Sequence, residues 1–459
     1  GKSSHTKTQL SIHKTVRHHT KSVRKNNNMN KIEFTFISLS HSIDMIFEFT
    51  ESNNEFINNF MFLFAKKEDI NDENRTATIQ SQQKNTPELR AEVDKFIEHY
   101  KSLDIKVFQL RSYFQKLIDG EYFLIWPNGN LTSEQRTEFY NYLSSLRDGE
   151  DYQTVSEQMS DLFGELKTTY KIQAFDESTK GKIGEQDKSK RVCRFCNNER
   201  EESTFKNIAH AISESLGNKK IILNEECDQC NSEFGSAQGI ENSLITFLKF
   251  YGIFFGVKGK NGIPKIKGRN FELSNDGQIE IKHFADNDDD IDNEEDLTET
   301  KLQLDTYDSI IMQDIYKTLC KYALSVVENN EIAKFQKTIS WINGKTEITT
   351  LPKVAILTSY DFFKTHPSLI VYLRKDKNTD LPYAVGELHY TFLTLVFVIP
   401  MAESDTKDFS EDENYENFWQ FFKHYNSTEN WNFRNFSDKT KRKFTLNLNF
   451  KQKDKSTNA

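Results

Sequence analysis

Four of the five cysteines in this chain of 459 residues stand as two Cys-x-x-Cys pairs. The first pair is Cys193 and Cys196, and the second is Cys227 and Cys230, with thirty residues between the pairs. Each pair offers two thiolates, and four thiolates complete the tetrahedral site that zinc accepts. A disulfide framework needs an oxidising compartment, a redox motif normally occurs once, and iron–sulfur ligation stays an alternative without further support. The pattern therefore predicts a structural zinc ion.

Composition indicates several packed cores and no membrane span. Hydrophobic residues make up 36% of the chain, with 37 Phe and 17 Tyr. The best apolar run, FLTLVFVIPM from Phe392, is about half of the ~20 residues that a membrane-crossing helix needs, and we interpret it as a buried strand. Residues 1–28 carry seven Lys or Arg and no acidic residue. We interpret them as a disordered basic tail or cloning-derived sequence. Without a secretory signal we expect a cytoplasmic location and no membrane partner.

Charge is distributed unevenly along the chain. The formal net charge is −9, yet residues 188–270 carry a net +5. A basic module in an acidic protein predicts that any polyanion is bound locally, rather than by the whole surface.

Residues 29–180 read as a mainly helical domain. In its clearest helix Thr86 is the cap, Pro87 takes the first turn, and apolar residues recur at helical spacing until Gly120. The stretch KIEFTFISL, from Lys31, has strand character.

The C-terminal part is predicted to be α+β. We interpret residues 271–300 as an acidic linker. The acidic run from Asp288 has acidic side chains at the spacing of a calcium-binding loop, but it lacks the glycine and the apolar residue that such a loop needs. In residues 301–459 a long amphipathic helix, with Cys320 on its apolar stripe, precedes strands that predict an antiparallel sheet. The whole chain is thus expected to be α+β and multidomain.

Between the cysteine pairs lies a segment of strand, loop and strand, and a helix follows. His210 ends the first strand, and the second cysteine pair opens a helix that we predict to run on to about residue 251. With zinc fixing the ends, this order describes a ββα unit in which His210 and Asn231 face each other.

At residues 190–270 the succession Cys-x-x-Cys, Ala-His-x-Ile, Leu-Gly-Asn and Cys-x-x-Cys-Asn resembles the HNH endonuclease family, in its bacterial, zinc-stapled ββα-metal form. The resemblance implies an HNH module over residues 188–270. It also implies His210 as general base for water that attacks a phosphodiester, and Asn224 as the residue that orients the imidazole. Asn231 would bind Mg²⁺ or Mn²⁺ through its amide oxygen, with helix capping as the alternative role.

Two positions depart from the family pattern. Ala209 stands where many members carry a metal ligand, and Ser213 stands where many carry proline. The missing ligand leaves Glu225, Glu226 or His210 itself as candidates for the first shell of the metal.

The segment that follows the predicted helix, VKGKNGIPKIKGRN from Val257, is basic and has no acidic residue. Such a loop can contact a phosphate backbone without reading bases. The alternative is a solvated basic loop. The candidate nucleic-acid contacts are Lys258, Lys260, Lys265, Lys267 and Arg269.

These features predict a metal-dependent HNH endonuclease, with DNA favoured over RNA as the nucleic-acid partner. By analogy with multidomain bacterial members, we expect an anti-phage or restriction effector controlled by its flanking domains, a protein partner or homo-oligomerisation. The alternatives are a non-catalytic zinc module that binds nucleic acid or protein, and an HNH-type RNase.

Overall fold

The computed structural model describes residues 29–50, 54–71, 76–103, 106–127, 131–177, 179, 181–199, 203–284, 299–359, 363–375 and 377–451. The basic segment 1–28 and the acidic run 285–298 lie outside the described residues. The chain divides into two compact units, residues 1–161 and residues 162–459. This division differs from the expected boundaries, and each unit is described by itself.

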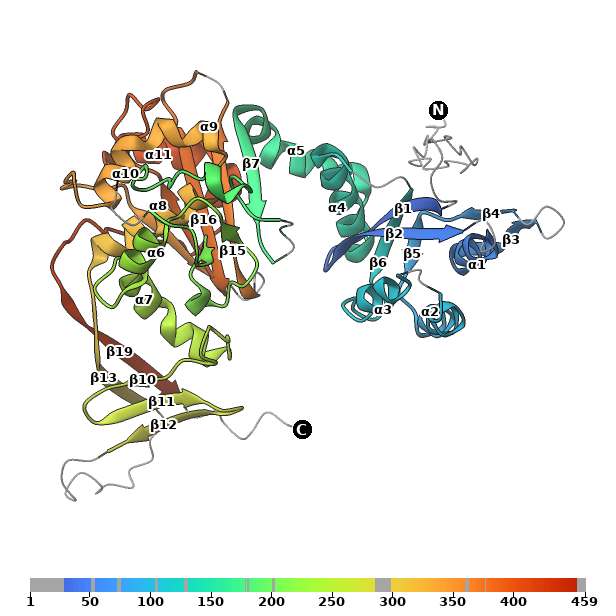
Figure 1. Cartoon of the computed structure of the whole chain (residues 1–459), viewed down its shortest axis with the longest axis horizontal. Coiled ribbons are helices and arrows are strands. Elements are labelled where there is room, and N and C mark those ends of the chain that lie inside the picture. Colours follow the sequence, from blue (N-terminus) through green and yellow to red (C-terminus); the bar gives the residue numbers. More distant parts are fainter. Residues whose placement is uncertain are drawn as a thin grey trace, which may run out of the picture. The chain divides into compact units, whose positions relative to one another are not determined.

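The first unit is built on a four-stranded antiparallel sheet with the strand order β2-β1-β6-β5 (Figure 1). A separate two-stranded sheet pairs β3 with β4. The strands of this unit are β1 (Met29–Ser38), β2 (Ser42–Thr50), β3 (Ala65–Asn71), β4 (Thr76–Ile79), β5 (Gln82–Lys84) and β6 (Tyr122–Pro127). Its helices are α1 (Asn54–Phe64), α2 (Pro87–Tyr100), α3 (Phe108–Phe114) and α4 (Ser133–Asp148), and α5 (Tyr152–Thr169) crosses the division between the units.

Alternation along β1 places apolar side chains on both faces of this sheet. Phe34 and Phe36 belong to one buried cluster, together with side chains of α1, α2 and α3. Ile37 belongs to a second cluster with Phe139 and Leu143 of α4. The expectation of a mainly helical region was therefore incomplete, because a sheet buried on both faces organises it.

Helix α2 begins as predicted, with Thr86 accepting a hydrogen bond from the backbone N–H of Leu89 at 3.2 Å and Pro87 in the first turn. The predicted single helix is wrong beyond Tyr100, because α3 begins only at Phe108. Both helices contribute to the same buried cluster. The apolar periodicity therefore continues across the break and could not reveal it.

The second unit contains a six-stranded sheet with the order β18-β14-β17-β16-β15-β7, in which every neighbouring pair is antiparallel. The antiparallel C-terminal sheet is thus confirmed. The strands are β7 (Tyr170–Phe175), β14 (Val354–Thr358), β15 (Lys364–Arg374), β16 (Ala384–Thr391), β17 (Leu393–Val398) and β18 (Asn432–Arg434). Strand β7 was expected in the N-terminal domain, but it pairs with β15 at the edge of this sheet.

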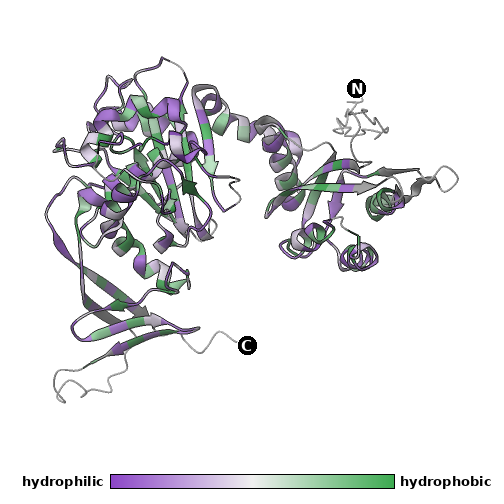
Figure 2. Ribbon diagram, viewed as in Figure 1, coloured by the Kyte–Doolittle hydropathy of each residue, from purple (hydrophilic) through white to green (hydrophobic). Residues whose placement is uncertain are grey.

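Both faces of the six-stranded sheet are covered by helices (Figure 1). In Figure 2 its strands carry much of the apolar colour of the unit. One face packs with α8 (Met312–Val326) and α10 (Gln336–Ile342), and the other packs with α11 (Asp412–Phe421) and α12 (Lys423–Asn426). The short helices α9 (Asn329–Ile332) and η5 (Ala333–Phe335) link α8 to α10.

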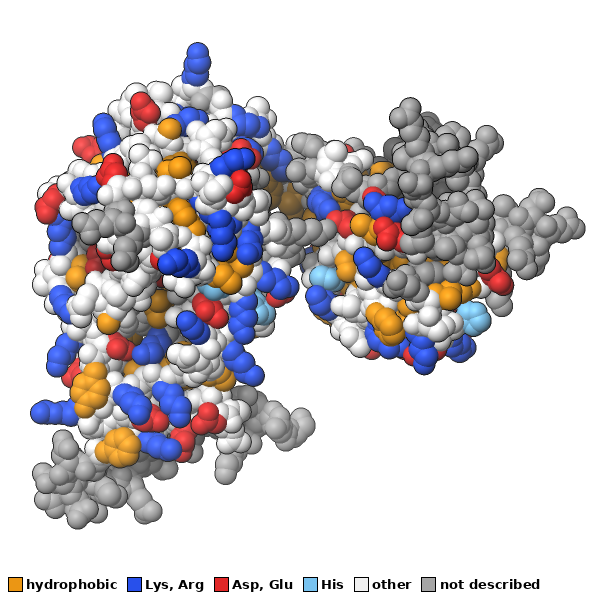
Figure 3. Space-filling view, in the orientation of Figure 1, with side chains coloured by type: hydrophobic (Ala, Val, Ile, Leu, Met, Phe, Trp, Pro, Cys, Tyr) orange, Lys and Arg blue, Asp and Glu red, His pale blue; other side chains and the backbone are white. Residues whose placement is uncertain are grey.

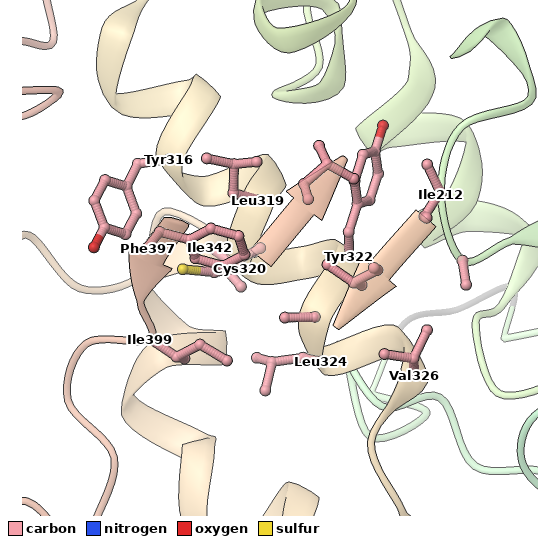
Figure 4. Packing of buried hydrophobic residues seen from close by; sticks show 14 of the residues in the cluster. Ile212, Tyr316, Leu319, Cys320, Tyr322, Leu324, Val326, Ile342, Phe397 and Ile399 are labelled. Atoms are coloured by element: carbon pink, nitrogen blue, oxygen red, sulfur yellow. The ribbon is translucent and has the colours of Figure 1, made fainter. Parts of the chain in front are cut away.

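The cysteine module is not a separate domain. Its elements are η2 (Lys188–Lys190), β8 (Ala209–His210), η3 (Glu214–Leu216), β9 (Ile222–Leu223), α6 (Asp228–Gly235) and α7 (Glu241–Phe254). Its apolar residues share one buried cluster with α8 and the sheet, and Figure 4 shows Ile212 of the module with Tyr322 and Leu324 of α8. Cys320 lies in this cluster and is fully buried, as predicted.

The expected linker 271–300 contains strands. A three-stranded sheet joins β10 (Ile266–Lys267), β11 (Phe271–Asn275) and β12 (Ile279–His283), and the long strands β13 (Glu299–Ile310) and β19 (Arg442–Lys451) pair with each other. Gly277 has φ +103°, which suits the tight turn between β11 and β12. The apolar alternation on either side of that turn could have indicated a hairpin.

Within the described residues, none of the helices combines the length and apolarity that crossing a bilayer requires.

Candidate functional site

The four cysteines of the two pairs come together in one buried cluster. Their sulfur atoms all lie within 4.8 Å of one another, and Cys196 Sγ and Cys227 Sγ are 3.7 Å apart. Four thiolates about 2.3 Å from one ion would stand about 3.8 Å apart. All five cysteines of the chain are free thiols. The geometry therefore fits a single tetrahedral zinc ion and no disulfide.

The electrostatics of the sulfur cluster also favour a cation. A hydrogen bond with Cys230 lowers the pKa of the Cys193 thiol to about 5, whereas burial raises the pKa of Cys227 to about 11. The cluster can thus stabilise one thiolate through hydrogen bonds from the other thiols. Ionisation of a second thiol is disfavoured by burial and by repulsion from the first thiolate. A divalent cation removes this repulsion, and its four sulfur ligands would leave no open position for chemistry.

Arg194 connects the first cysteine pair to the end of α8. Its Nε donates to Glu225 Oε2 at 2.9 Å, and its Nη1 donates to the carbonyls of Leu324 and Val327 at 3.0 and 2.6 Å. Glu225 Oε1 accepts further hydrogen bonds from Asn329 Nδ2 and from a backbone N–H. Glu225, which we considered as a ligand of the catalytic metal, is therefore fully used in the scaffold.

Glu226 is likewise part of the scaffold. Lys321 of α8 lies 2.9 Å from Glu226 and 2.9 Å from Glu241 of α7, and all three side chains are almost fully buried. Burial raises the pKa of Glu226 to about 7, although Lys321 opposes this shift. A buried ammonium between two carboxylates ties α8 to both α7 and the loop before Cys227, and it leaves Glu226 little freedom to bind another cation.

His210 lies in a short antiparallel pair of strands, where it stands opposite Ile222 and Ala209 stands opposite Leu223. Ala209 is buried, whereas His210 keeps partial exposure. Burial lowers the pKa of His210 from its usual value, and Lys260 and Lys321 act in the same direction, against Glu214 and Glu241. A lowered pKa keeps the imidazole neutral at pH 7, which is the form that accepts a proton.

Asn218 shapes the loop between these strands, and the sequence reasoning missed this role. Its Nδ2 donates to the carbonyls of Ile212 and Ile221 at 2.7 and 2.9 Å, while its Oδ1 accepts from the N–H of Ile221 at 2.9 Å. Asn218 is buried. A Gly-Asn pair between two strands was the signal that could have indicated a side chain closing this loop.

Asn224 is buried, with 5% of its surface exposed. It follows Ile222, the partner of His210, by two residues, and strand alternation places such residues on one face. Its Nδ2 has no hydrogen-bond partner among the described residues. Leaving a buried amide nitrogen without a hydrogen-bond partner costs about 1–3 kcal/mol.

Asn231 lies on α6 directly after the last cysteine and keeps partial exposure. The cap of α6 is Cys227, whose Sγ accepts a hydrogen bond from the N–H of Cys230 at 3.5 Å. The alternative role of Asn231 as the N-terminal cap of this helix is therefore wrong.

Residues 193–239 match the family model described as HNH endonuclease. The resemblance seen in the sequence is thereby confirmed for this segment. No curated protein and no solved structure matches the chain. We call residues 193–239 the HNH segment.

The predicted helix after the second cysteine pair is interrupted in the HNH segment. Helix α6 ends at Gly235, and α7 begins at Glu241. A Cβ atom on Gly239 would lie 2.2 Å from the carbonyl oxygens of Glu233 and Phe234. Only glycine fits at this position, because the backbone of the turn packs directly against the backbone at the end of α6.

Two of the five predicted basic residues lie beside acidic side chains. Lys267 lies 3.1 Å from Glu272, and Lys265 lies 3.8 Å from Glu272 and 3.9 Å from Asp276. Lys258, Lys260 and Arg269 are exposed. Figure 3 shows Lys and Arg side chains spread over one face of the second unit, with Asp and Glu side chains among them.

A second metal-binding cluster is not evident in the described part of the chain. The four cysteines are the one group there of three or more His, Cys, Asp or Glu side chains that could hold an ion. A catalytic cation at the HNH segment would thus depend on few protein ligands, together with water and substrate. Mg²⁺ tolerates such a site, because it usually keeps several waters.

Proposed function

We propose that this protein is a metal-dependent endonuclease that hydrolyses phosphodiester bonds at its HNH segment, with DNA as the preferred substrate. The observation that carries the proposal is the position of His210. It is a partly exposed imidazole of lowered pKa, on the β8–β9 hairpin of a segment that matches the HNH endonuclease family.

His210 is the general base in this proposal. It removes a proton from water while the water oxygen bonds to phosphorus, the bond from phosphorus to the leaving sugar oxygen breaks, and that oxygen takes a proton from solvent. The buried amide of Asn224 orients the imidazole. A divalent cation, when bound, supplies positive charge at the reacting phosphate.

Asn231 is the proposed ligand of that cation. Asn231 lies on α6, directly after Cys230 of the four-cysteine cluster. Zinc has a structural role, because its four thiolate ligands close the coordination shell. The exposed Lys258, Lys260 and Arg269 are proposed to contact the phosphate backbone, while Lys265 and Lys267 share their charge with Glu272.

The test is cleavage by the purified full chain. Plasmid DNA and a structured RNA are incubated with Mg²⁺ or Mn²⁺, and with excess EDTA as the control. We expect divalent-dependent nicking or linearisation of the plasmid, with RNA cut more slowly. Preferential RNA cleavage would assign the RNase alternative, and failure to cut either substrate with both cations would contradict the proposal.

The role of Asn231 is tested by two substitutions. Asn231→Asp keeps an oxygen donor, so we expect cleavage that requires no more cation than the wild type does. Asn231→Ala removes the donor, and we expect a several-fold higher Mg²⁺ requirement. An unchanged Mg²⁺ dependence in Asn231→Ala would exclude it as a ligand.

A second candidate function is a non-catalytic zinc module that binds nucleic acid or protein. Ala209 in place of a metal ligand favours it, together with the scaffold contacts of Glu225 and Glu226. In that case wild type and His210→Ala would bind nucleic acid equally and neither would cut it.

The biological role is proposed to be anti-phage defence or restriction, controlled by the remainder of the chain, a protein partner or self-association. The support is that the HNH segment occupies a small part of a long chain. We expect expression of the wild type, but not of His210→Ala, to lower phage titre on a bacterial host. Equal phage titres with the wild type and with His210→Ala would contradict a role in defence.

A further inference from the structure

Aromatic side chains from three parts of the chain meet at the C-terminal end of α7. The ring centroid of Phe255 lies 5.1 Å from that of Phe254 and 5.0 Å from that of Phe363, which directly precedes β15. Phe392, in the turn between β16 and β17, lies 5.0 Å from Phe255 and 5.5 Å from Tyr251. We call this group the aromatic patch. Its members are Phe250, Tyr251, Phe254, Phe255, Phe363 and Phe392.

Two rings of the aromatic patch are open to solvent. Phe254 has 46% of its surface exposed, and Phe363 has 42%. Both contact the ring of Phe255, so they are neighbours on one surface. The rings of Tyr251, Phe255 and Phe392 are partly buried against the large core of the second unit. The exposed rings therefore rest on packed neighbours, and a group of apolar rings left in contact with water favours a binding partner.

Positive charge lies beside the aromatic patch. The guanidinium of Arg434, on the edge strand β18, lies 5.9 Å from the ring centroid of Phe247, one helical turn before Tyr251. Burial raises the pKa of Tyr251, and the charge of Arg434 opposes this shift. Arg434 is exposed and has no acidic partner within the described residues. From Phe247 to Phe271 the chain has no acidic residue. The surroundings of the patch thus suit a negatively charged ligand.

The aromatic patch adjoins the HNH segment through the end of α7. Val257 follows Phe255 by two residues, a chain length of at most about 7 Å. A Cβ atom on Gly217 would lie 2.9 Å from Val257 Cγ1, so Val257 packs on the loop between β8 and β9. His210 ends the first of these two strands. A ligand on the patch therefore lies next to the loop of the β8–β9 hairpin.

The chemistry of the patch favours unpaired bases. A phenylalanine ring carries no hydrogen-bonding group, so it gains nothing from phosphate groups, and in a duplex the base faces are stacked on one another. Unpaired bases offer their flat faces to aromatic side chains, and arginine adds cation–π and phosphate contacts. The charge of Arg434 and the neighbouring HNH segment favour this ligand over an apolar protein surface.

We propose that the aromatic patch stacks the unpaired bases of a single-stranded nucleic acid, and that the HNH segment cuts a strand that is unpaired beside the cut. This inference rests on the proposed nuclease function and adds the strandedness of the substrate. A supercoiled plasmid offers such a strand wherever its duplex opens.

Binding by the full chain is measured by fluorescence anisotropy in EDTA, where metal-dependent cleavage is blocked. The probes are oligo(dT), the same strand paired with oligo(dA), and an abasic strand of equal charge. We expect wild type to bind oligo(dT) at least about tenfold more tightly than the other two probes. The double variant Phe254→Ala/Phe363→Ala should lose about 10- to 100-fold in affinity for oligo(dT), with little change for the duplex and the abasic strand.

Two variants are the controls. Phe254→Trp/Phe363→Trp keeps the stacking faces and should bind oligo(dT) at least as well as wild type. Tyr307→Ala removes an exposed ring of β13 outside the patch and should leave binding unchanged. Equal losses for oligo(dT) and the abasic strand, or no loss at all, would overturn the proposal. Loss of self-association in the double alanine variant, with oligo(dT) binding intact, would assign the patch to a second copy and overturn it as well.

Cleavage separates this inference from the proposed function. With Mg²⁺ or Mn²⁺ we expect wild type to cut single-stranded circular DNA faster than relaxed duplex circles, and the double alanine variant to lose this preference. Equal rates on both circles in wild type would overturn the inference while the nuclease function stands. Failure of wild type to cut either circle, with ring-dependent oligo(dT) binding present, would instead contradict the nuclease function.

Discussion

Arg194 stands between Cys193 and Cys196 of the four-cysteine cluster, yet its side chain belongs to the contact with α8. Its partners Leu324, Val327 and Asn329 lie more than a hundred residues further along the chain. The cysteines could be identified from the sequence because their spacing alone matches a metal site. The role of Arg194 could not, because it depends on which distant carbonyls fold against it.

Arg194→Met should destabilise the second unit by about 3–5 kcal/mol, because it leaves Glu225 buried without its cation and the end of α8 without donors. Urea denaturation of the full chain measures the loss. The control is Arg191→Met, since Arg191 donates to backbone carbonyls on the partly exposed side of the same segment. A loss below about 1 kcal/mol for Arg194→Met would contradict this assignment.

His424 makes the stability of the second unit dependent on pH. Burial lowers its pKa from 6.5 to about 4, and neither ring nitrogen has a hydrogen-bond partner among the described residues. The unfolded chain takes up the proton below about pH 6.5, but the folded chain does so only near pH 4. Stability is therefore lost as pH falls through this window.

We expect the free energy of unfolding to fall with acid by up to about 3 kcal/mol more in wild type than in His424→Phe, between pH 7 and pH 4. Phenylalanine can keep the ring contacts with Phe163 and Tyr425. Urea titrations at several pH values compare the two proteins. Parallel pH profiles would show that His424 titrates normally in the folded state.

At the scale of elements, helix starts were easier to predict than helix ends. Thr86 and Pro87 marked the start of α2 through local hydrogen bonding. The break between α6 and α7 depends on a backbone contact of Gly239 with Glu233 and Phe234, which apolar spacing does not encode. The ββα order of the HNH segment was predicted from two strand-like runs and the helix that the second cysteine pair opens, although β8 and β9 are only two residues each.

Gly239→Ala should distort the turn between α6 and α7 and destabilise the second unit by at least about 2 kcal/mol, because a Cβ atom there would overlap backbone oxygens. The control is Gly235→Ala in α6, where a Cβ atom has its nearest neighbour at 4.0 Å. That change should be neutral or stabilising by up to about 1 kcal/mol. Equal urea midpoints for both variants would argue against the contact.

At the scale of the whole molecule, the HNH segment and the six-stranded sheet share one buried core. The buried cluster that contains the four cysteines continues through α8 into strands β15, β16 and β17. The sequence suggested a module bounded at 188 and 270, because the polar segments at each side resembled linkers. Their composition could not reveal that the core crosses these boundaries.

A fragment of residues 188–270 should therefore remain largely unfolded even with zinc, since it lacks Lys321 and the carbonyls that Arg194 binds. A fragment of residues 162–459 should fold, because it contains the whole compact unit. Dispersion of amide signals in NMR spectra of the two zinc-loaded fragments tests this. A well-dispersed spectrum for 188–270 would show an autonomous module.

The most direct measurement of the central claim is the cleavage rate of His210→Ala relative to wild type, in preparations with the same zinc content. We expect one zinc per chain in both proteins and a rate at least about 100-fold lower in the variant, since a positioned general base contributes about that much. Equal cleavage rates at equal zinc content would contradict the assignment of His210 as the base, and with it the hydrolytic centre proposed for the HNH segment.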